Sequence, residues 1–471
     1  MAATFMRMLI LLSLLLCLFA SGGTGRGEQR PPVRYLLSYA APGNTSVHMR
    51  IELPGAPPAA RTLMIPRAVP MGYGEEPYDQ FVASVAAFDP AGKPLEVARG
   101  DGPRWHVGPA ARVEYDVDLA RMEQQIHDAT DSSHVRPGYA SFLGYSVFGF
   151  IEGEEERAIE LNIDAPKGWP VVSTLAPAGG SPRAENFYAL ADSQIAMGPA
   201  LRFERMQIAP ATTPPLYLAL YAEADADPVR LARLAGEAFT GMIAYFGSAP
   251  FAHYTVLLEI LKPVSAEHEY GFGMEHLESF HSTLDARGEG LSDLGLRYHI
   301  AHHMAHAWIP KRSYGEGYFP FRWDAAAKID TIWFSEGFAQ YAAIAALAAS
   351  EEQREQMLER RFRSVLQEAS PELRRLSLRE LSLAASTQYA SDFRIGKLTF
   401  SRGGLMAAEM DDRIRAQTHG EKSLREALRH LVAWSAENHR AFRIEELPVR
   451  FREATGVETR DILERWLAPL E

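Results

Sequence analysis

The stretch that decides the fold reads RYHIAHHMAHAWIPKR, from Arg297 to Arg312. Four histidines fall within eight of its residues, at positions 299, 302, 303 and 306. A helix that stops before Pro310 turns by about 100° per residue, which places all four on one face. His302 and His306 are one helical turn apart, so their imidazoles can meet one zinc ion from the same side. Histidines without a ligand are the alternative to a metal-binding helix at this point, and the surrounding sequence favours the metal-binding helix.

A carboxylate further along the chain is suited to be a third ligand. The sequence DTIWFSEGFAQYAAIAAL, residues 330–347, predicts a second, buried helix. After its first residue it holds a single acid, Glu336, among apolar neighbours. A buried carboxylate is unfavourable unless it is paired or bound to a metal. Glu336 is therefore predicted to bind the ion, with an ordinary ion pair as the alternative, and Gln340 to orient a ligand.

A glycine-containing segment precedes both helices. In EYGFGMEHLESFHSTL, residues 269–284, glycines flank Phe272 and lead into Met274 and Glu275. Glycine in a strand permits close approach of another backbone. We expect Gly273 and Met274 to lie against a substrate chain and Glu275 to hold its ammonium group. The alternative is a glycine-rich turn beside an exposed acid.

The N-terminus and the net charge limit the possible locations and partners. Residues 1–25 contain a short basic start, an apolar run from Met8 to Ala20 and then small residues, which predicts a signal peptide and a secreted or periplasmic protein. The run is short for a membrane span, although an uncleaved anchor is the alternative. Cys17, the one cysteine, lies inside it. A net charge of −12 argues against a nucleic-acid partner.

The periodicity of the sequence changes near residue 225. Before it, stretches such as SVHMRIEL (46–53) and RVEYDVDL (112–119) alternate apolar and polar residues, which is typical of antiparallel strands in a sandwich. After it, Asp227 and Pro228 begin an amphipathic helix, and the remainder reads as mostly helical. The sequence predicts a β-rich domain over 29–222 and a second domain over 223–471.

Together these motifs resemble a known family. A segment ending in Met-Glu-His, then His-x-x-x-His, then Trp-Phe-x-Glu-Gly-Phe is similar to gluzincin zinc metallopeptidases, in particular the glycyl aminopeptidase family. The tail HAWIPKR resembles that family's His-x-Trp-x-x-Lys-Arg. The resemblance implies an α+β multidomain fold, with a β-sandwich-like domain followed by a thermolysin-like, mostly helical metallopeptidase domain. The family's C-terminal PDZ domain has no counterpart up to Glu471.

The resemblance also implies roles for single residues. His302, His306 and Glu336 take the places of the ligands of one zinc ion. Glu275 takes the place of the anchor for the free N-terminus of a peptide or protein, the expected partner.

Two family positions differ. His303 stands where the family has its general-base glutamate. Phe400 stands where it has the tyrosine that stabilises the oxyanion, although Tyr389 is an alternative donor. We therefore expect a zinc site with impaired or lost peptide hydrolysis. The alternatives are an active aminopeptidase that uses His303 as an unusual base, and a non-catalytic protein that binds peptides or uses the metal as a structural fastener.

Overall fold

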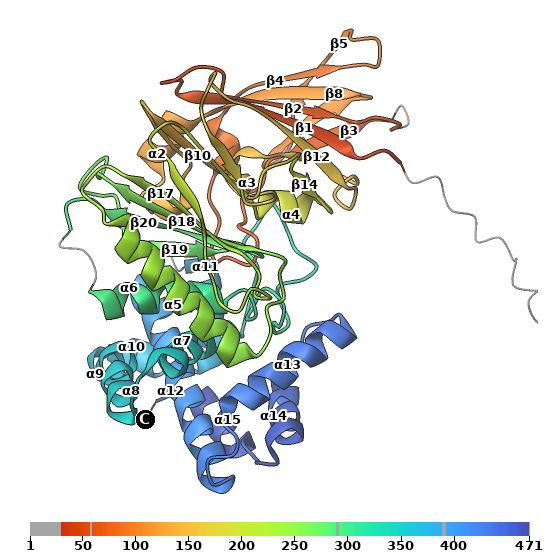
Figure 1. Ribbon diagram of the computed structural model, residues 1–471. Helices are drawn as coiled ribbons and strands as arrows, with labels where there is room; N and C mark the ends of the chain where they lie inside the picture. The colour runs from red at the N-terminus through yellow and green to blue at the C-terminus, as the bar shows by residue number, and fades with distance from the viewer. Residues whose placement is uncertain (1–29, 57–58, 289–291, 389–391, 471) are drawn as a thin grey trace, which may run out of the picture.

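The computed structural model describes residues 30–56, 59–288, 292–388 and 392–470. The predicted signal peptide with Cys17, and Tyr389, lie outside the described residues. A β-rich N-terminal part sits above a mostly helical C-terminal part, as Figure 1 shows. None of the described helices has the length and apolar character that a membrane crossing requires.

Three sheets form the N-terminal part. The first has the order β14 (Arg183–Ala184), β12 (Ile159–Asp164), β1 (Val33–Ser38), β2 (Ser46–Glu52), β8 (Arg112–Asp118), β4 (Val82–Phe88), β5 (Pro94–Leu95). The second has the order β13 (Val171–Ser173), β15 (Gln194–Met197), β10 (Tyr139–Leu143), β9 (His134–Arg136). The third has the order β11 (Phe150–Ile151), β3 (Arg61–Met64), β7 (Arg104–Gly108), β6 (Ala98–Arg99). Between them lie the short helices η1 (Tyr78–Phe81), α2 (Leu119–Gln125), η2 (Ala129–Asp131), α3 (Gly144–Val147) and α4 (Phe187–Ala191).

The alternating pattern produces this core as predicted. Strands β2 and β8 pair antiparallel and bury every second residue. Val47, Met49 and Ile51 are almost fully enclosed. Their polar neighbours remain on the other face, because successive side chains of a strand point to opposite sides. In the first sheet, strand β1 pairs with strand β12 in parallel orientation.

A fourth sheet crosses the predicted domain boundary. Its order is β16 (Arg202–Met206), β17 (Leu216–Ala222), β18 (Tyr254–Leu261), β20 (Ser279–Asp285), β19 (Phe272–Glu275). The predicted boundary between residues 222 and 223 falls between β17 and its parallel neighbour β18. A period-two pattern identifies strands but not the sheet they join. The crossover is α5 (Pro228–Phe246), which Asp227 caps and Pro228 opens as predicted.

The rest of the chain is helical. Its elements are α6 (Asp293–Ala305), α7 (Ile332–Leu347), α8 (Glu351–Leu358), the π-helical turn η3 (Glu359–Arg363), α9 (Ser364–Glu368), α10 (Pro371–Arg374), α11 (Leu378–Gln388), α12 (Phe393–Gln417), α13 (Leu424–Asn438), η4 (Ile444–Glu446), α14 (Leu447–Thr455) and α15 (Arg460–Leu467). Helix α7 lies at the centre of this part, between α6 and α12, and twelve of its sixteen residues are buried. This central position explains its apolar composition.

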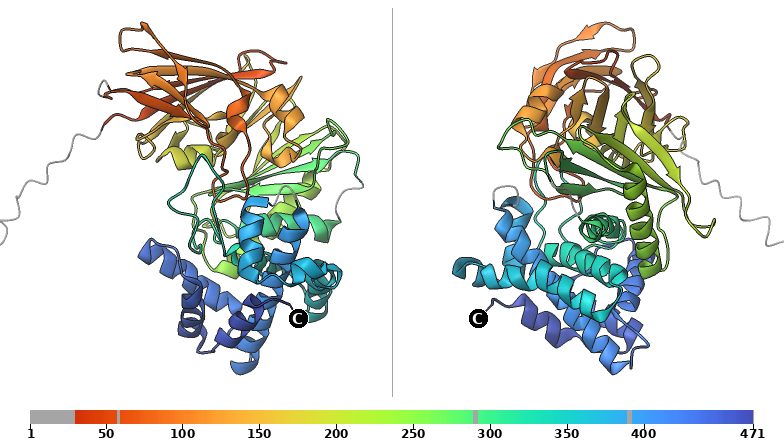
Figure 2. Two further views of the ribbon diagram at one scale, coloured as in Figure 1. Left: turned by 180° about the vertical axis from the view of Figure 1, so that it is seen from behind. Right: turned by 60° about the vertical axis from the view of Figure 1, so that its left-hand side comes forward.

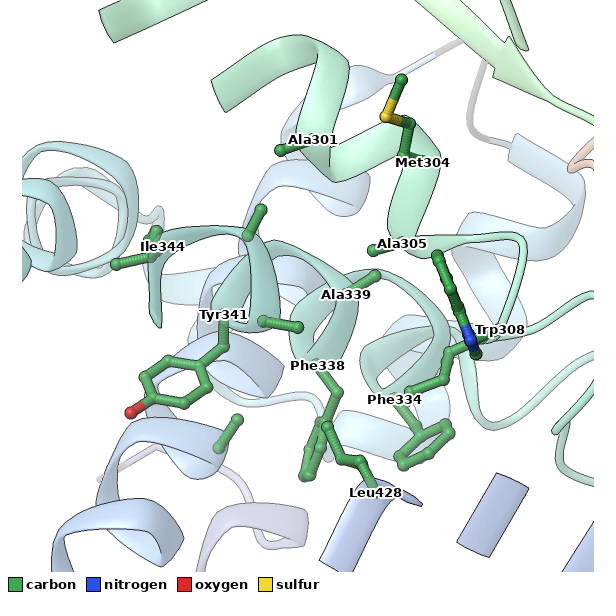
Figure 3. Close-up of a cluster of buried hydrophobic side chains, with 14 of the residues drawn as sticks. Ala301, Met304, Ala305, Trp308, Phe334, Phe338, Ala339, Tyr341, Ile344 and Leu428 are labelled. Atoms are coloured by element: carbon green, nitrogen blue, oxygen red, sulfur yellow. The ribbon is translucent and has the colours of Figure 1, made fainter. Parts of the chain in front are cut away.

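Small residues let α7 approach its neighbours closely. Figure 3 shows Ala301 and Ala305 of α6 on the side that faces α7, with Ala339 of α7 near Ala305. On its other side α7 crosses α12 at glycines, and a Cβ atom on Gly337 would overlap the backbone of Gly403. These two contacts fix where α6, α7 and α12 project their polar side chains.

The two parts of the molecule meet across two sheets. Side chains of β10 pack against those of β17 and β18, and the rings of Tyr139 and Tyr221 stack with centroids 4.0 Å apart. Within this contact Glu259 is buried, its Oε2 3.2 Å from His134 Nδ1, and its Oε1 accepts from the Ser141 hydroxyl at 2.7 Å. Burial alone would raise the pKa of Glu259, but the neighbouring His134 lowers it to about 2.

Replacing this carboxylate is expected to weaken the contact between the two parts. Glu259→Gln leaves the buried His134 without its charged partner and should lower the free energy of unfolding by about 3–5 kcal/mol. The pKa of Glu259 is lower in the folded protein than its ordinary value of 4.5. The pair therefore stabilises the fold above pH 4.5, and this contribution is lost as the pH falls toward 2.

Urea unfolding of both proteins at pH 7 and at acid pH measures this effect. The difference between wild type and Glu259→Gln should shrink in acid. Glu160→Gln, which removes an exposed partner of Arg183, is the matched control and should change stability by less than about 1 kcal/mol. Equal effects of the two substitutions would contradict the prediction.

Candidate metal centre and substrate pocket

Helices α6 and α7 bring three predicted ligands to one point. The Nε2 atoms of His302 and His306 are 2.9 Å apart, and Glu336 Oε2 lies 3.2 Å from the first and 3.6 Å from the second. Ligand atoms around a tetrahedral zinc ion at about 2.0–2.1 Å are about 3.3 Å from one another. The donor set of these residues, here called the metal cluster, therefore fits a single zinc ion.

Hydrogen bonds outside the metal cluster orient its members. His306 Nδ1 donates to the Ile309 carbonyl oxygen at 2.8 Å, which leaves Nε2 with a free lone pair. The hydroxyl of Tyr73 donates to Glu336 Oε1 at 2.9 Å, so Oε2 remains for the ion. Gln340 also hydrogen-bonds Glu336, as its position one turn later predicts.

The electrostatics of the cluster suit a cation. Burial, reinforced by the nearby Glu275, raises the pKa of Glu336 to about 7 even though His306 acts in the opposite direction. Burial, together with the neighbouring imidazole of His303, holds the pKa of His302 well below its usual range. A neutral imidazole is the form that binds metal. A divalent ion would satisfy the buried carboxylate and both ring nitrogens at once.

The other two histidines of α6 face different partners. His299 Nε2 lies 2.9 Å from the Ser282 hydroxyl of β20. His303 stacks on Phe280 with ring centroids 5.6 Å apart, and burial lowers its pKa. Its Nε2 lies against Gly273, where a Cβ atom would come within 2.7 Å. The close approach predicted at Gly273 therefore admits the His303 ring, and Gly273 also lines the cavity described below.

Glu275 lies beside the metal cluster on the edge strand β19. Its Oε2 is 3.7 Å from His303 Nδ1 and 4.0 Å from His306 Nε2. Burial alone would raise the pKa of Glu275, but His306, His303 and Lys311 together hold it below its usual range. An ionised carboxylate in this place can receive an ammonium group.

A cavity of about 460 Å³ opens onto these residues. Its walls include the predicted residues Gly273, Met274, Glu275, His302, His303, Glu336 and Phe400. Helix α12 carries Phe400, one turn before the glycine crossing with α7, and the ring is nearly buried. No hydroxyl is present on this side chain, so it cannot donate a hydrogen bond to an oxyanion.

Sequence reasoning missed several side chains of this cavity. Tyr73, Asp128 and Asp131 reach it from the N-terminal part, and Arg360 and Arg361 reach it from η3. For Tyr73 the one available signal is a tyrosine between two glycines in GYG, residues 72–74. A loop has no periodicity, so this signal gives no position in space.

Removing the Tyr73 hydroxyl is expected to weaken metal binding. Tyr73→Phe leaves Glu336 Oε1 without its donor, and losses of such supporting hydrogen bonds typically reduce metal affinity by about 10–100-fold. Competition with a chromogenic zinc chelator measures the affinity. Tyr35→Phe, which removes a buried hydroxyl bonded to the Gly149 carbonyl far along the chain, should leave it unchanged. If Tyr73→Phe binds zinc as tightly as the wild type, Tyr73 does not support the metal cluster.

The fold and the metal cluster define a zinc-metallopeptidase-like protein. The model of the peptidase M61 N-terminal domain matches residues 34–199, and the model of the M61 glycyl aminopeptidase matches residues 296–398. Together they cover more than half of the chain. The chain belongs to the M61 glycyl aminopeptidase family. Among curated proteins, none matches it by sequence.

Solved structures show the same fold. An aminopeptidase N family protein from Idiomarina loihiensis superposes with a TM-score of 0.79 at 19% identity, over 93% of this chain and 76% of that one. An M1 zinc metallopeptidase from Deinococcus radiodurans gives a TM-score of 0.54 at 14% identity, over 93% of this chain and 94% of that one. A mutant of the Deinococcus enzyme has been solved with a Tyr-Ser-Ala substrate and gives the same TM-score, 0.54.

Proposed function

We propose that this protein binds one zinc ion and the free N-terminus of a peptide, and that it hydrolyses peptide bonds poorly or not at all. One observation carries the proposal. His302 and Glu336 of the metal cluster line a pocket together with Glu275, and His303 and Phe400 stand in that pocket at the family's base and oxyanion-donor positions. On the strength of residues 1–25, the protein is proposed to act in the periplasm or outside the cell.

The residues of the pocket support binding more than proton transfer. Glu275 offers an ionised carboxylate to the ammonium group. A zinc ion held by His302, His306 and Glu336 would polarise the carbonyl oxygen of the first peptide bond. The ring of His303 is confined between Phe280 and Gly273, and its lowered pKa disfavours the charged form that a proton carrier must adopt. Phe400 offers no donor for the oxyanion.

A second candidate function rests on the pairing of His303 with Glu275. Their separation of 3.7 Å allows the carboxylate to orient the imidazole as an unusual general base. This alternative predicts slow, zinc-dependent release of N-terminal residues by the wild-type protein. The substitution His303→Ala would abolish that release.

Calorimetry with a short peptide tests the proposal. Glu275→Gln removes a charge-assisted hydrogen bond and should weaken peptide binding by about 10–100-fold. Glu278→Gln, three residues away and paired with His253, is the matched control. Mass spectrometry after the titration should recover the peptide intact. Turnover at the rate of an ordinary aminopeptidase contradicts impaired hydrolysis, and a titration without heat contradicts peptide binding.

A further inference from the structure

The pocket carries opposite charges on its two sides. Asp128, Asp131 and Glu275 lie among its acidic residues. Its basic residues are Arg360, Arg361 and Lys397. Since Glu275 and the metal cluster already account for an N-terminal ammonium and a peptide carbonyl, the basic side remains to be explained.

The basic residues have no carboxylate partner among the residues that the structure describes. Arg361 lies over the Tyr298 ring, 4.4 Å from its centroid, and Lys397 lies over the Phe393 ring at 4.8 Å. In contrast Arg363, on the same π-helical turn, pairs with Glu355 at 2.8 Å. In a chain with a net charge of −12, acids to pair with are plentiful. π-Helical turns occur frequently at functional sites.

The acidic side of the pocket offers carboxylates to a cation. Asp131 lines the pocket, and its Oδ1 has no hydrogen-bond partner among the described residues. Its helix η2 lies beside β19. Asp128, the residue before η2, forms an isolated β-bridge with Glu269, three residues before β19 begins. Burial and the neighbouring carboxylate of Asp128 raise the pKa of Asp131 well above its usual range. An ammonium group has three N–H donors and can serve more than one of these carboxylates.

The metal cluster lies between the two sides. Arg361 packs on the Tyr298 ring, and the Tyr298 hydroxyl donates to Gln340 beside Glu336. The positive charge of Arg361 also helps to lower the pKa of His302. Glu275 instead lies beside His303 and His306. In Figure 1 β19 lies above α6, and α8 and α9, which flank η3, lie below it.

We infer that the pocket takes a short peptide that bears a carboxylate two or three residues from its free N-terminus, with the ammonium on the Asp131–Glu275 side and the carboxylate at Arg360 and Arg361. The inference rests on the proposed function and names its ligand class. A peptide of two to four residues spans about 7–14 Å when extended, which suits a cavity of 460 Å³. Arginine binds carboxylates through paired N–H donors.

Three probes and the zinc-loaded full chain test the inference by calorimetry. The first probe, trialanine, has its carboxylate at the C-terminus. The second, trialanine amide, has no carboxylate. The third, Ala-Ala-Asp amide, has its carboxylate on a side chain. We expect the amide of trialanine to bind at least tenfold more weakly than the acid. Ala-Ala-Asp amide shows whether a side-chain carboxylate restores the affinity, and recovery there also supports a carboxylate site.

Substitutions locate the carboxylate contact. Arg360→Gln with Arg361→Gln changes two exposed residues and should make the acid and the amide of trialanine bind alike. Arg363→Gln, on the same turn, should keep the preference for the acid. Equal binding of all three probes to the wild type overturns the inference alone. Failure of every probe to bind overturns the inference and the peptide-binding proposal together.

Discussion

His303→Glu combined with Phe400→Tyr is expected to raise zinc-dependent aminopeptidase activity by on the order of ten-thousandfold over the wild type. A positioned general base typically contributes about 10²–10⁴ in rate. One oxyanion donor contributes about 10²–10³. Both positions line the pocket, one on α6 and one on α12, and the packing of these helices against α7 fixes where the new side chains point.

Release of glycine and alanine from chromogenic anilides, with and without a chelator, measures the gain. Each single substitution should recover only part of it, because base and donor act in the same step. His303→Gln with Phe400→Tyr is the matched control, since glutamine has nearly the shape of glutamate but no basic oxygen. It should stay near the wild-type rate. A double substitution that remains inactive while binding zinc would contradict the assigned roles of both positions.

His306→Ala is expected to lower zinc affinity on the order of a thousandfold. Structural zinc sites bind with about 10–16 kcal/mol in total, so one ligand of four contributes about 2.5–4 kcal/mol. His306 is fully buried between His302 and the Ile309 carbonyl. Metal analysis after dialysis and chelator competition should show one zinc ion in the wild type and none in the variant.

A control variant tests the choice of His302 and His306 as the ligand pair. His299→Ala changes another histidine on the same helix, one whose ring contacts Ser282 and not the cluster. The zinc affinity of His299→Ala should stay within about tenfold of the wild-type affinity, because residues outside the ligand set have effects of about this size. Zinc loss in His299→Ala with retention in His306→Ala would reverse the choice of ligands.

The sequence predicts the metal cluster well because helical geometry is regular. The spacing of His302 and His306 fixes their relative direction, and the lone acid in an apolar helix marks Glu336. Strands β2 and β8 follow equally from their alternation. The pairing of β17 with β18 across a helix could not be predicted, because pairing between distant segments leaves no local pattern.

The remaining site residues depend on tertiary structure. Tyr73 comes from a loop, and Arg360 and Arg361 come from a π-helical turn whose spacing differs from that of an α-helix. The sequence predicts a close approach at Gly273, and in the structure the His303 ring lies against it. Local sequence shows that space is needed and leaves open what fills it.

The hydrogen bond from Tyr73 to Glu336 joins the two parts of the molecule at the site itself. This contact bears on how the metal affinity of such a protein can change in evolution. Exchanges in the loop around Tyr73 can tune how tightly the ion is held while every histidine stays in place. The β-rich part is therefore a component of the metal centre, and a fragment confined to residues 223–471 would keep the ligands but lose the control over them.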